Sequence, residues 1–203
     1  MFVIVRHGNT FENGETPRRV GARTDLPLTA KGWEQARALG AYFANKDIQF
    51  DRILISPLLR TQQTARAILD AQPSPPEAQT AEFLREIDYG PDENKPESEV
   101  LARIGSAALE AWEKRGEEPE GWIVNASERL EAWRDLLTDA HARPGSTLLV
   151  TSNGAARFAL LAEPELAKAS AQLESLKLPT GGFGIVARSK SGRLDLIEWG
   201  ERP

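Results

Sequence analysis

The stretch Met1-Phe2-Val3-Ile4-Val5-Arg6-His7-Gly8 decides the fold class of this chain. Its first five residues are apolar and largely β-branched, a pattern that predicts a short buried strand. A fixed cation, an imidazole and a glycine that permits close backbone approach follow directly. Polar residues at the end of a buried strand are typical of a ligand site at the edge of a sheet. The opening of the chain therefore predicts a strand that delivers Arg6 and His7 to such a site.

The same arrangement of an apolar strand followed by polar residues occurs twice more. Residues 51–55 predict a second strand that leads through Ser56-Pro57 to Arg60, and residues 147–151 predict a third that leads into Ser152-Asn153-Gly154. Apolar spacing and turn signals predict the remaining elements: helices over 29–45 with Thr29 as N-cap, 59–71, 97–114 and 128–142, a helix from about Gly154, and a closing hairpin over 182–187 and 194–199.

This alternation predicts an α/β fold, a three-layer sandwich with a mostly parallel sheet and helices on both faces. Parallel strands place their carboxyl ends at one edge, which brings Arg6, Arg60 and Asn153 together. Helix N-termini favour anions there, so we expect a phosphate pocket at the C-terminal strand edge. The length of 203 residues predicts a single domain over 1–203, with residues of about 88–130, rich in proline and acids, as a small cap within it.

Composition excludes several classes of function. The formal net charge of -5 argues against a nucleic-acid partner, and no apolar stretch reaches the length of about eighteen residues that a membrane span needs. With no cysteine and only two histidines, the chain offers little material for a transition-metal centre, so we expect neither a metal nor a cofactor. We expect a cytoplasmic protein that acts on a small phosphorylated substrate.

Four segments in the first 90 residues carry a family resemblance. They are Arg6-His7-Gly8-Asn9-Thr10-Phe11-Glu12-Asn13, Arg23-Thr24-Asp25-Leu26-Pro27-Leu28-Thr29-Ala30-Lys31-Gly32-Trp33-Glu34-Gln35-Ala36, Ser56-Pro57-Leu58-Leu59-Arg60-Thr61-Gln62-Gln63-Thr64-Ala65 and Leu84-Arg85-Glu86-Ile87-Asp88-Tyr89-Gly90. In content and order they resemble the motifs of the histidine phosphatase superfamily, which includes the cofactor-dependent phosphoglycerate mutases. The resemblance is weak from Pro91 to Pro144 and resumes around the strand at 147–151.

The resemblance implies a role for each matching residue. His7 would attack phosphorus and form a phosphohistidine, while Arg6 and Arg60 would hold the phosphoryl oxygens. Asn13 would add an uncharged phosphate donor. Glu86 would protonate the leaving group and then activate water. The implied activity is that of a metal-independent phosphomonoesterase.

The chain departs from the family pattern at Asn153, where the family has a second histidine. An amide can donate to a phosphate oxygen but carries no charge, so Asn153 is interpreted as a phosphate-binding residue. The change fits an adapted enzyme, a weakened one, or an engineered substitution. The alternatives to a phosphatase are therefore a phospho-ligand-binding or regulatory protein with little turnover, and phosphotransfer of the phosphoglycerate mutase type.

Some charged residues keep more than one interpretation. Asp88 and Glu82 compete with Glu86 for the role of the acid. The basic loop of Arg18, Arg19 and Arg23 either meets an anionic part of the substrate or is solvated. The second histidine, His141, is expected to have no catalytic role.

Overall fold

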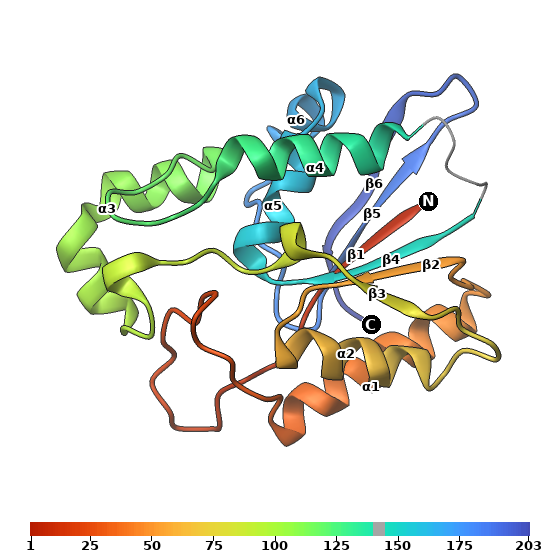
Figure 1. Ribbon diagram of the computed structural model, residues 1–203, viewed down its shortest axis with the longest axis horizontal. Helices are drawn as coiled ribbons and strands as arrows, with labels where there is room; N and C mark the ends of the chain where they lie inside the picture. The colour runs from red at the N-terminus through yellow and green to blue at the C-terminus, as the bar shows by residue number, and fades with distance from the viewer. Residues whose placement is uncertain (140–144) are drawn as a thin grey trace.

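The computed structural model describes residues 1–139 and 145–203. Its strands form one six-stranded sheet in the order β3-β2-β4-β1-β5-β6 (Figure 1). The strands are β1 (Phe2–Arg6), β2 (Arg52–Ile55), β3 (Ala78–Thr80), β4 (Thr147–Thr151), β5 (Phe183–Arg188) and β6 (Leu194–Glu201). Strands β3, β2, β4 and β1 are parallel to one another. Strand β5 pairs antiparallel with β1, and β6 pairs antiparallel with β5. The predicted α/β class and the closing hairpin are thus confirmed.

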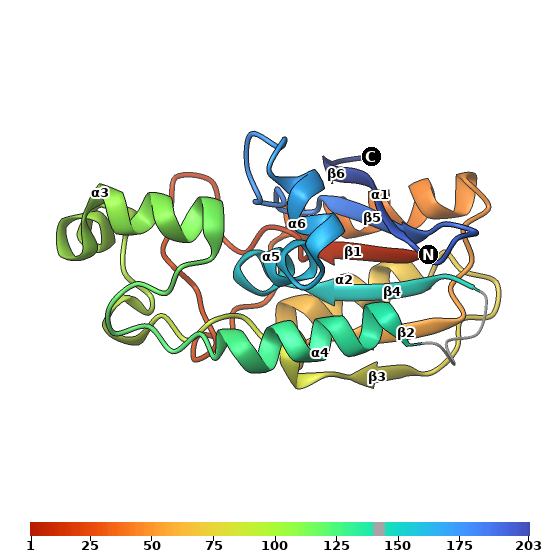
Figure 2. The same cartoon turned by 90° about the horizontal axis from the view of Figure 1, so that it is seen from above.

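Helices cover both faces of the sheet, as Figure 2 shows. They are α1 (Ala30–Asn45), α2 (Leu59–Leu69), α3 (Glu97–Arg115), α4 (Ala126–Thr138), α5 (Asn153–Leu161) and α6 (Pro164–Ser170), with short 3-10 turns at Glu82–Leu84 and Gly90–Asp92. Thr29 is the N-cap of α1, because its hydroxyl accepts a hydrogen bond from the Gly32 N–H at 3.1 Å. No helix within the described residues is long and apolar enough to cross a membrane.

The central strands β1 and β4 have two apolar faces, because side chains alternate along a strand and nearly all of theirs are buried. In β1, Val3 and Val5 pack with α1 and α2, whereas Phe2 and Ile4 belong to the core under α4 and α5. Burying both faces explains why the strands read as continuous apolar runs instead of alternating ones.

The described helices and strands differ from the predicted ones in a few places. Helix α4 begins at Ala126 and ends at Thr138, so it starts two residues before the predicted 128. The predicted helix extended to residue 142, but residues 140–142, including His141, lie outside the described part of the chain. Strand β3 was not predicted, because it is only three exposed residues long and carries no apolar signal. Helix α6 was not predicted either.

The register of the sheet brings three strand ends together. Arg6 at the end of β1 pairs with Thr151 at the end of β4, and Ile55 of β2 pairs with Val150. The residues after these strands therefore leave the sheet at one edge, as expected. Helix α3 and the segments beside it extend beyond this edge, to the left in Figure 1.

A buried arginine attaches α3 to the rest of the molecule. Arg157 of α5 donates through Nη1 to the backbone oxygen of Trp112, and its Cζ lies 4.1 Å from the centre of the Trp112 ring. Burial lowers the pKa of Arg157 to about 10, which still leaves the side chain charged at neutral pH. Trp112 and Arg157 are both fully buried, so this contact fixes the C-terminal half of α3, beyond the break that Gly105 makes in the helix with φ 79° and ψ 162°.

Candidate active site

The side chain of His7 is buried and has one defined tautomer. The Arg60 Nε–H donates to His7 Nε2 at 3.2 Å, and an arginine has no acceptor, so Nε2 must be unprotonated. The other ring nitrogen, Nδ1, lies 2.8 Å from the backbone oxygen of Gly8, to which it donates its proton. Burial lowers the pKa of His7 well below 6.5, and the charges of Arg60 and Arg6 lower it further. His7 is therefore a neutral imidazole with its lone pair on Nε2.

The backbone around His7 is held by a close approach of two segments. The Gly8 N–H donates to Thr64 Oγ1 at 3.1 Å, which ties the residue after His7 to α2. A Cβ on Gly8 would lie 2.3 Å from the backbone oxygen of Gly32, so only glycine fits there. This explains why a glycine must follow the histidine in this structure.

Arg60 is fully buried at the start of α2. Besides its contact with His7, it donates through Nη1 to the Thr24 backbone oxygen at 2.9 Å and through Nη2 to the Gly21 oxygen at 3.2 Å. The loop after β1 therefore wraps around this guanidinium, and neutral carbonyl groups fix it without cancelling its charge.

Arg6 and Asn153 share one backbone partner, Leu178. Arg6 Nη1 donates to the Leu178 oxygen at 2.8 Å, and the Leu178 N–H donates to Asn153 Oδ1 at 3.0 Å. The second bond fixes the amide of Asn153, because its oxygen is occupied by a donor. Its NH₂ group is thereby left as the group that can donate to a ligand.

Glu86 is buried against the N-terminus of α5. Its two carboxylate oxygens accept from three backbone N–H groups: Ile87 at 2.9 Å, Gly154 at 3.1 Å and Ala155 at 3.1 Å. A Cβ on Gly154 would lie 2.3 Å from Glu86 Oε1, so this glycine makes room for the carboxylate. The helix N-terminus favours negative charge, and this contact orients Glu86.

These side chains border one cavity of about 340 Å³. The cavity is lined by Arg6, His7, Asn9, Thr10, Phe11, Pro17, Arg18, Arg19, Val20, Glu86, Tyr89, Glu97, Asn153 and Thr180. Four of the six predicted site residues thus line it, namely Arg6, His7, Glu86 and Asn153. Arg60 does not line the cavity, but it donates to His7, which does. Asp88 and Glu82 do not line it; Asp88 pairs with Arg23 at 3.0 Å and Glu82 with Arg85 at 2.8 Å.

Asn13 does not line the cavity. It is exposed and lies in a turn with Gly14, which has a φ of 89°. A hydrogen bond from the Glu15 N–H to the Glu12 backbone oxygen at 3.1 Å closes this turn. Neighbouring residues Asn9, Thr10 and Phe11 line the cavity instead. The phosphate-binding role of Asn13 stays a prediction.

The cavity also contains residues that sequence reasoning did not assign to the site. Tyr89, three residues after Glu86, is buried, and burial raises the pKa of its hydroxyl, so it is a neutral donor. Thr180 comes from the loop before β5, and Glu97 begins α3. Only Tyr89 had a signal, its place beside the Glu86 motif.

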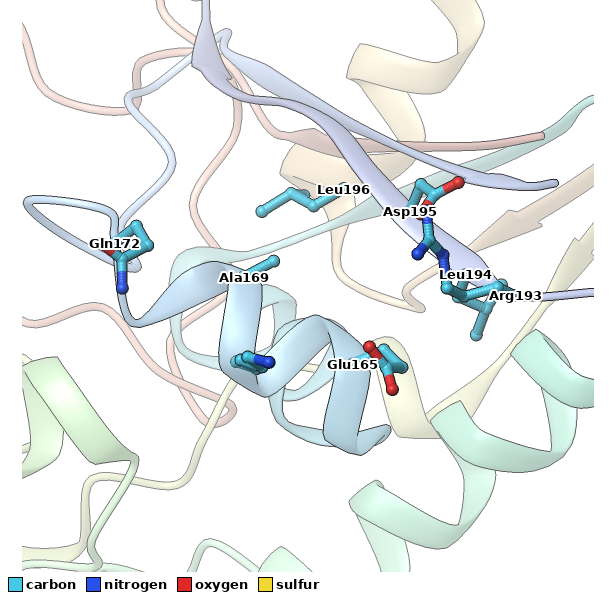
Figure 3. A pocket seen from close by; sticks show the side chains of 8 residues that line it. Glu165, Ala169, Gln172, Arg193, Leu194, Asp195 and Leu196 are labelled. Atoms are coloured by element: carbon cyan, nitrogen blue, oxygen red, sulfur yellow. The ribbon is translucent and has the colours of Figure 1, made fainter.

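A second hollow lies away from this cavity. It has a volume of about 390 Å³ and lies between α6 and β6, where Figure 3 shows Glu165, Arg193 and Asp195 around it. Arg193 and Asp195 form an ion pair at 2.8 Å, so part of its charge is compensated. Its lining holds neither a histidine nor a serine, threonine or cysteine that could act as a nucleophile. Among the described residues no group of three or more histidine, aspartate and glutamate side chains gathers as a metal site.

Comparison with known proteins shows the family of this chain. Residues 2–199 match the model of the histidine phosphatase superfamily (branch 1). A Bacillus subtilis protein named "Uncharacterized phosphatase PhoE" is 32% identical over 180 residues, which cover 86% of this chain and 81% of that protein. A 2,3-bisphosphoglycerate-dependent phosphoglycerate mutase of Rhizobium meliloti is 31% identical over 184 residues, covering 88% of this chain and 85% of that enzyme.

Solved structures share the fold over the whole chain. A mycobacterial glucosyl-3-phosphoglycerate phosphatase matches with a TM-score of 0.78 at 20% identity, covering 100% of this chain and 99% of its own. The chain belongs to the histidine phosphatase superfamily, whose members act as phosphatases or phosphoglycerate mutases.

The lowered pKa of His7 predicts a dependence of stability on pH. Below its ordinary pKa of 6.5 His7 binds a proton in the unfolded chain, but in the folded protein it stays neutral to a much lower pH. The unfolded state then binds more protons, so the free energy of unfolding falls as pH falls, by at most about 1.4 kcal/mol per pH unit for one group. We expect the stability of the wild type relative to His7→Gln to decrease between about pH 7 and pH 5.

Urea unfolding of both proteins across this range measures the difference directly. Other titrating groups are common to the two proteins and cancel in the comparison. A difference that stays constant with pH would mean that His7 has an ordinary pKa in the folded protein.

Proposed function

We propose that this protein is a metal-independent phosphatase that hydrolyses phosphomonoesters through a phosphohistidine on His7. The observation that carries the proposal is the contact between Arg60 Nε and His7 Nε2, since it places an unprotonated nitrogen beside a fixed positive charge. A neutral imidazole is the nucleophilic form of histidine. Arg6, Glu86 and Asn153 line the same cavity and supply a cation, an acid or base, and an uncharged donor.

In the first step, His7 Nε2 attacks phosphorus, so that an N–P bond forms as the P–O bond to the alcohol breaks. Arg6 and Arg60 neutralise the negative charge that spreads over the phosphoryl oxygens, with Arg60 turning its Nε–H from His7 to an oxygen. The Glu86 carboxylate takes up the proton of the phosphomonoester monoanion as the substrate binds and gives this proton to the leaving oxygen.

In the second step, Glu86 takes a proton from water, whose oxygen attacks phosphorus as the N–P bond breaks. Inorganic phosphate takes this proton from Glu86 as it leaves, so that His7 and Glu86 return to their starting states. The three backbone donors to Glu86 support this assignment, because they fix the carboxylate at the wall of the cavity.

Hydrolysis of p-nitrophenyl phosphate in the presence of a chelator tests the proposal. We expect turnover by the wild type without added metal and a loss of at least about a thousandfold in His7→Ala, because the nucleophile is gone. His141→Ala is the matched control, as it removes the other histidine and is expected to retain activity. Equal rates for His7→Ala and the wild type would contradict the proposal, and binding of phosphate without turnover would favour a phospho-ligand-binding protein.

Phosphoglycerate mutase activity is a second candidate, because the Rhizobium meliloti relative that carries this name matches over most of both chains. A mutase would return the phosphoryl group from His7 to another hydroxyl of the phosphoglycerate. Incubation with 3-phosphoglycerate distinguishes the two activities, since a phosphatase releases inorganic phosphate and a mutase forms an isomer.

We further propose that Asn153 stands where the family has its second histidine and donates through its NH₂ group to the phosphoryl oxygens. The Leu178 N–H that donates to Asn153 Oδ1 supports this, because it requires an acceptor on the side chain at position 153. A protonated imidazole has no acceptor and would leave that N–H without a partner. The local structure therefore favours an amide, and we interpret Asn153 as an adapted residue.

Asn153→Asp isolates this donor, because the two side chains have nearly the same shape. The aspartate keeps one oxygen as the acceptor for the Leu178 N–H. Its other carboxylate oxygen replaces the NH₂ donor and repels the phosphoryl group. We expect kcat/KM for p-nitrophenyl phosphate to fall by about a hundredfold. Asn153→His is expected to be no faster than the wild type. If Asn153→His is instead at least tenfold faster, with an unchanged Tm, then Asn153 is a weakened position.

A further inference from the structure

Arg129, in the first turns of α4, contacts the segment that carries Glu86. Its Nη1 donates to the backbone oxygens of Phe83 at 2.9 Å and Arg85 at 2.6 Å, and its Nη2 donates to that of Glu86 at 3.4 Å. Its Nε donates to the Val124 oxygen, just before α4, at 2.8 Å. One guanidinium therefore joins the start of α4 to the backbone at Glu86.

The backbone at this point depends on side chains for its hydrogen bonds. Residues 85–87 belong to no helix or strand, so no regular ladder supplies donors to their carbonyl groups. The neighbouring Leu84 oxygen accepts from Thr151 Oγ1 at 2.6 Å, and the Ile87 oxygen accepts from a backbone N–H of the loop after β1 at 2.9 Å. Arg129 supplies the donors to the carbonyl groups between these two points.

The helix itself does not explain an arginine at this position. A cation near the N-terminus of a helix is disfavoured, because the free N–H groups there carry partial positive charge. The Arg129 side chain is also half-buried. Burial lowers its pKa, whereas the charge of Glu86 acts in the opposite direction. The interactions that favour arginine at this position are those with the segment of Glu86.

Glu86 is thus held at its backbone as well as at its side chain. Its carboxylate accepts from the Gly154 and Ala155 N–H groups, which open α5 and have no partners within the helix. Arg129 fixes the chain from which this carboxylate starts. A shift of that chain would move the carboxylate relative to α5 and to the cavity. General acid catalysis is sensitive to such a shift, because the acid must lie within hydrogen-bond reach of the leaving oxygen.

We propose that Arg129 is a positioning residue for Glu86, which holds the backbone of the acid so that its carboxyl group meets the leaving oxygen of the substrate. The inference rests on the proposed phosphatase function. Arg129 does not line the cavity, so it contacts neither the phosphoryl group nor the alcohol part. It acts through Glu86, and its loss therefore impairs proton transfer to the leaving oxygen more than attack by His7 Nε2.

Two substrates with different leaving groups test this role. The alkoxide that leaves benzyl phosphate needs a proton, whereas the phenolate that leaves p-nitrophenyl phosphate needs little protonation. Single-turnover rates of alcohol release measure the first step alone. We expect Arg129→Met to slow benzyl phosphate by about a hundredfold and p-nitrophenyl phosphate by less than about tenfold. The ratio of the p-nitrophenyl rate to the benzyl rate should thus rise at least about tenfold.

Arg134→Met is the matched control. It removes an arginine from the same helix, but Arg134 pairs with Glu163 at 3.1 Å. We expect its rate ratio to equal that of the wild type. A general loss of structure lowers the rates of both substrates alike and leaves their ratio unchanged. A folded Arg129→Met with the wild-type ratio would therefore overturn the inference.

Glu86→Gln shows whether Arg129 acts through Glu86. The glutamine cannot supply the proton, so Glu86→Gln should itself raise the rate ratio. In the double variant with Arg129→Met we expect no further rise, because two residues that act through one group are not additive. A further rise of about tenfold would mean that Arg129 acts independently of Glu86, and it would contradict the proposal.

Arg129→Lys replaces Arg129→Met if the methionine variant does not fold. Lysine carries one nitrogen in place of the three that contact four carbonyl groups, so it keeps the charge but not the fork of donors. We expect a rise of the rate ratio of at least about threefold. An unchanged ratio in this variant would count against the positioning role.

A measurement without turnover separates this inference from the proposed function. If the wild type does not hydrolyse p-nitrophenyl phosphate, then the phosphatase proposal fails. The NMR signals of the Gly154 and Ala155 amide protons still report the contact of Glu86 with α5. We expect both signals to move in Arg129→Met toward their positions in Glu86→Ala and to stay in place in Arg134→Met. Unchanged signals in Arg129→Met would overturn the inference.

Discussion

The hydrogen bond from Arg60 Nε to His7 Nε2 is the contact on which the rest of the site depends. A guanidinium can only donate, so it holds the imidazole in the neutral form with the lone pair facing the cation. Burial and the second cation, Arg6, act in the same direction on the pKa of His7. The phosphoryl group that we propose as the ligand replaces the imidazole as the partner of Arg60.

The backbone supplies most of the partners that orient these side chains. Leu178 holds both Arg6 and Asn153, the start of α5 holds Glu86, and carbonyls of the loop after β1 hold Arg60. A group that is fixed before the substrate arrives loses little conformational freedom when it binds. The sheet makes this possible, because β1, β2 and β4 end at one edge in a fixed register.

Much of this arrangement could be predicted from short stretches of sequence. Arg6, His7 and Arg60 each lie beside a strand or helix end that local patterns predict, and parallel strand order then brings them together. Glu86 lies beside no predicted element, and only the family resemblance indicated it. Asn13 is exposed in a turn with Gly14. The Asn-Gly pair is typical of a turn, but it does not indicate whether the asparagine side chain faces the site or the solvent. The contacts of Leu178 with Arg6 and Asn153 join segments far apart in the chain. Backbone groups carry no residue signature, so sequence cannot assign them.

The most direct test of the central claim is to trap the phosphoryl group on His7. In Glu86→Gln the proposed base for the second step is absent, so an aryl phosphate, whose leaving group needs little protonation, should phosphorylate the enzyme faster than water releases it. Rapid quenching followed by mass spectrometry of peptides locates the group. The account predicts an acid-labile phosphoryl group on the peptide that contains His7, formed in about one equivalent per chain. A phosphoryl group on any other residue, or steady turnover by Glu86→Gln with no phosphorylated peptide, would contradict it.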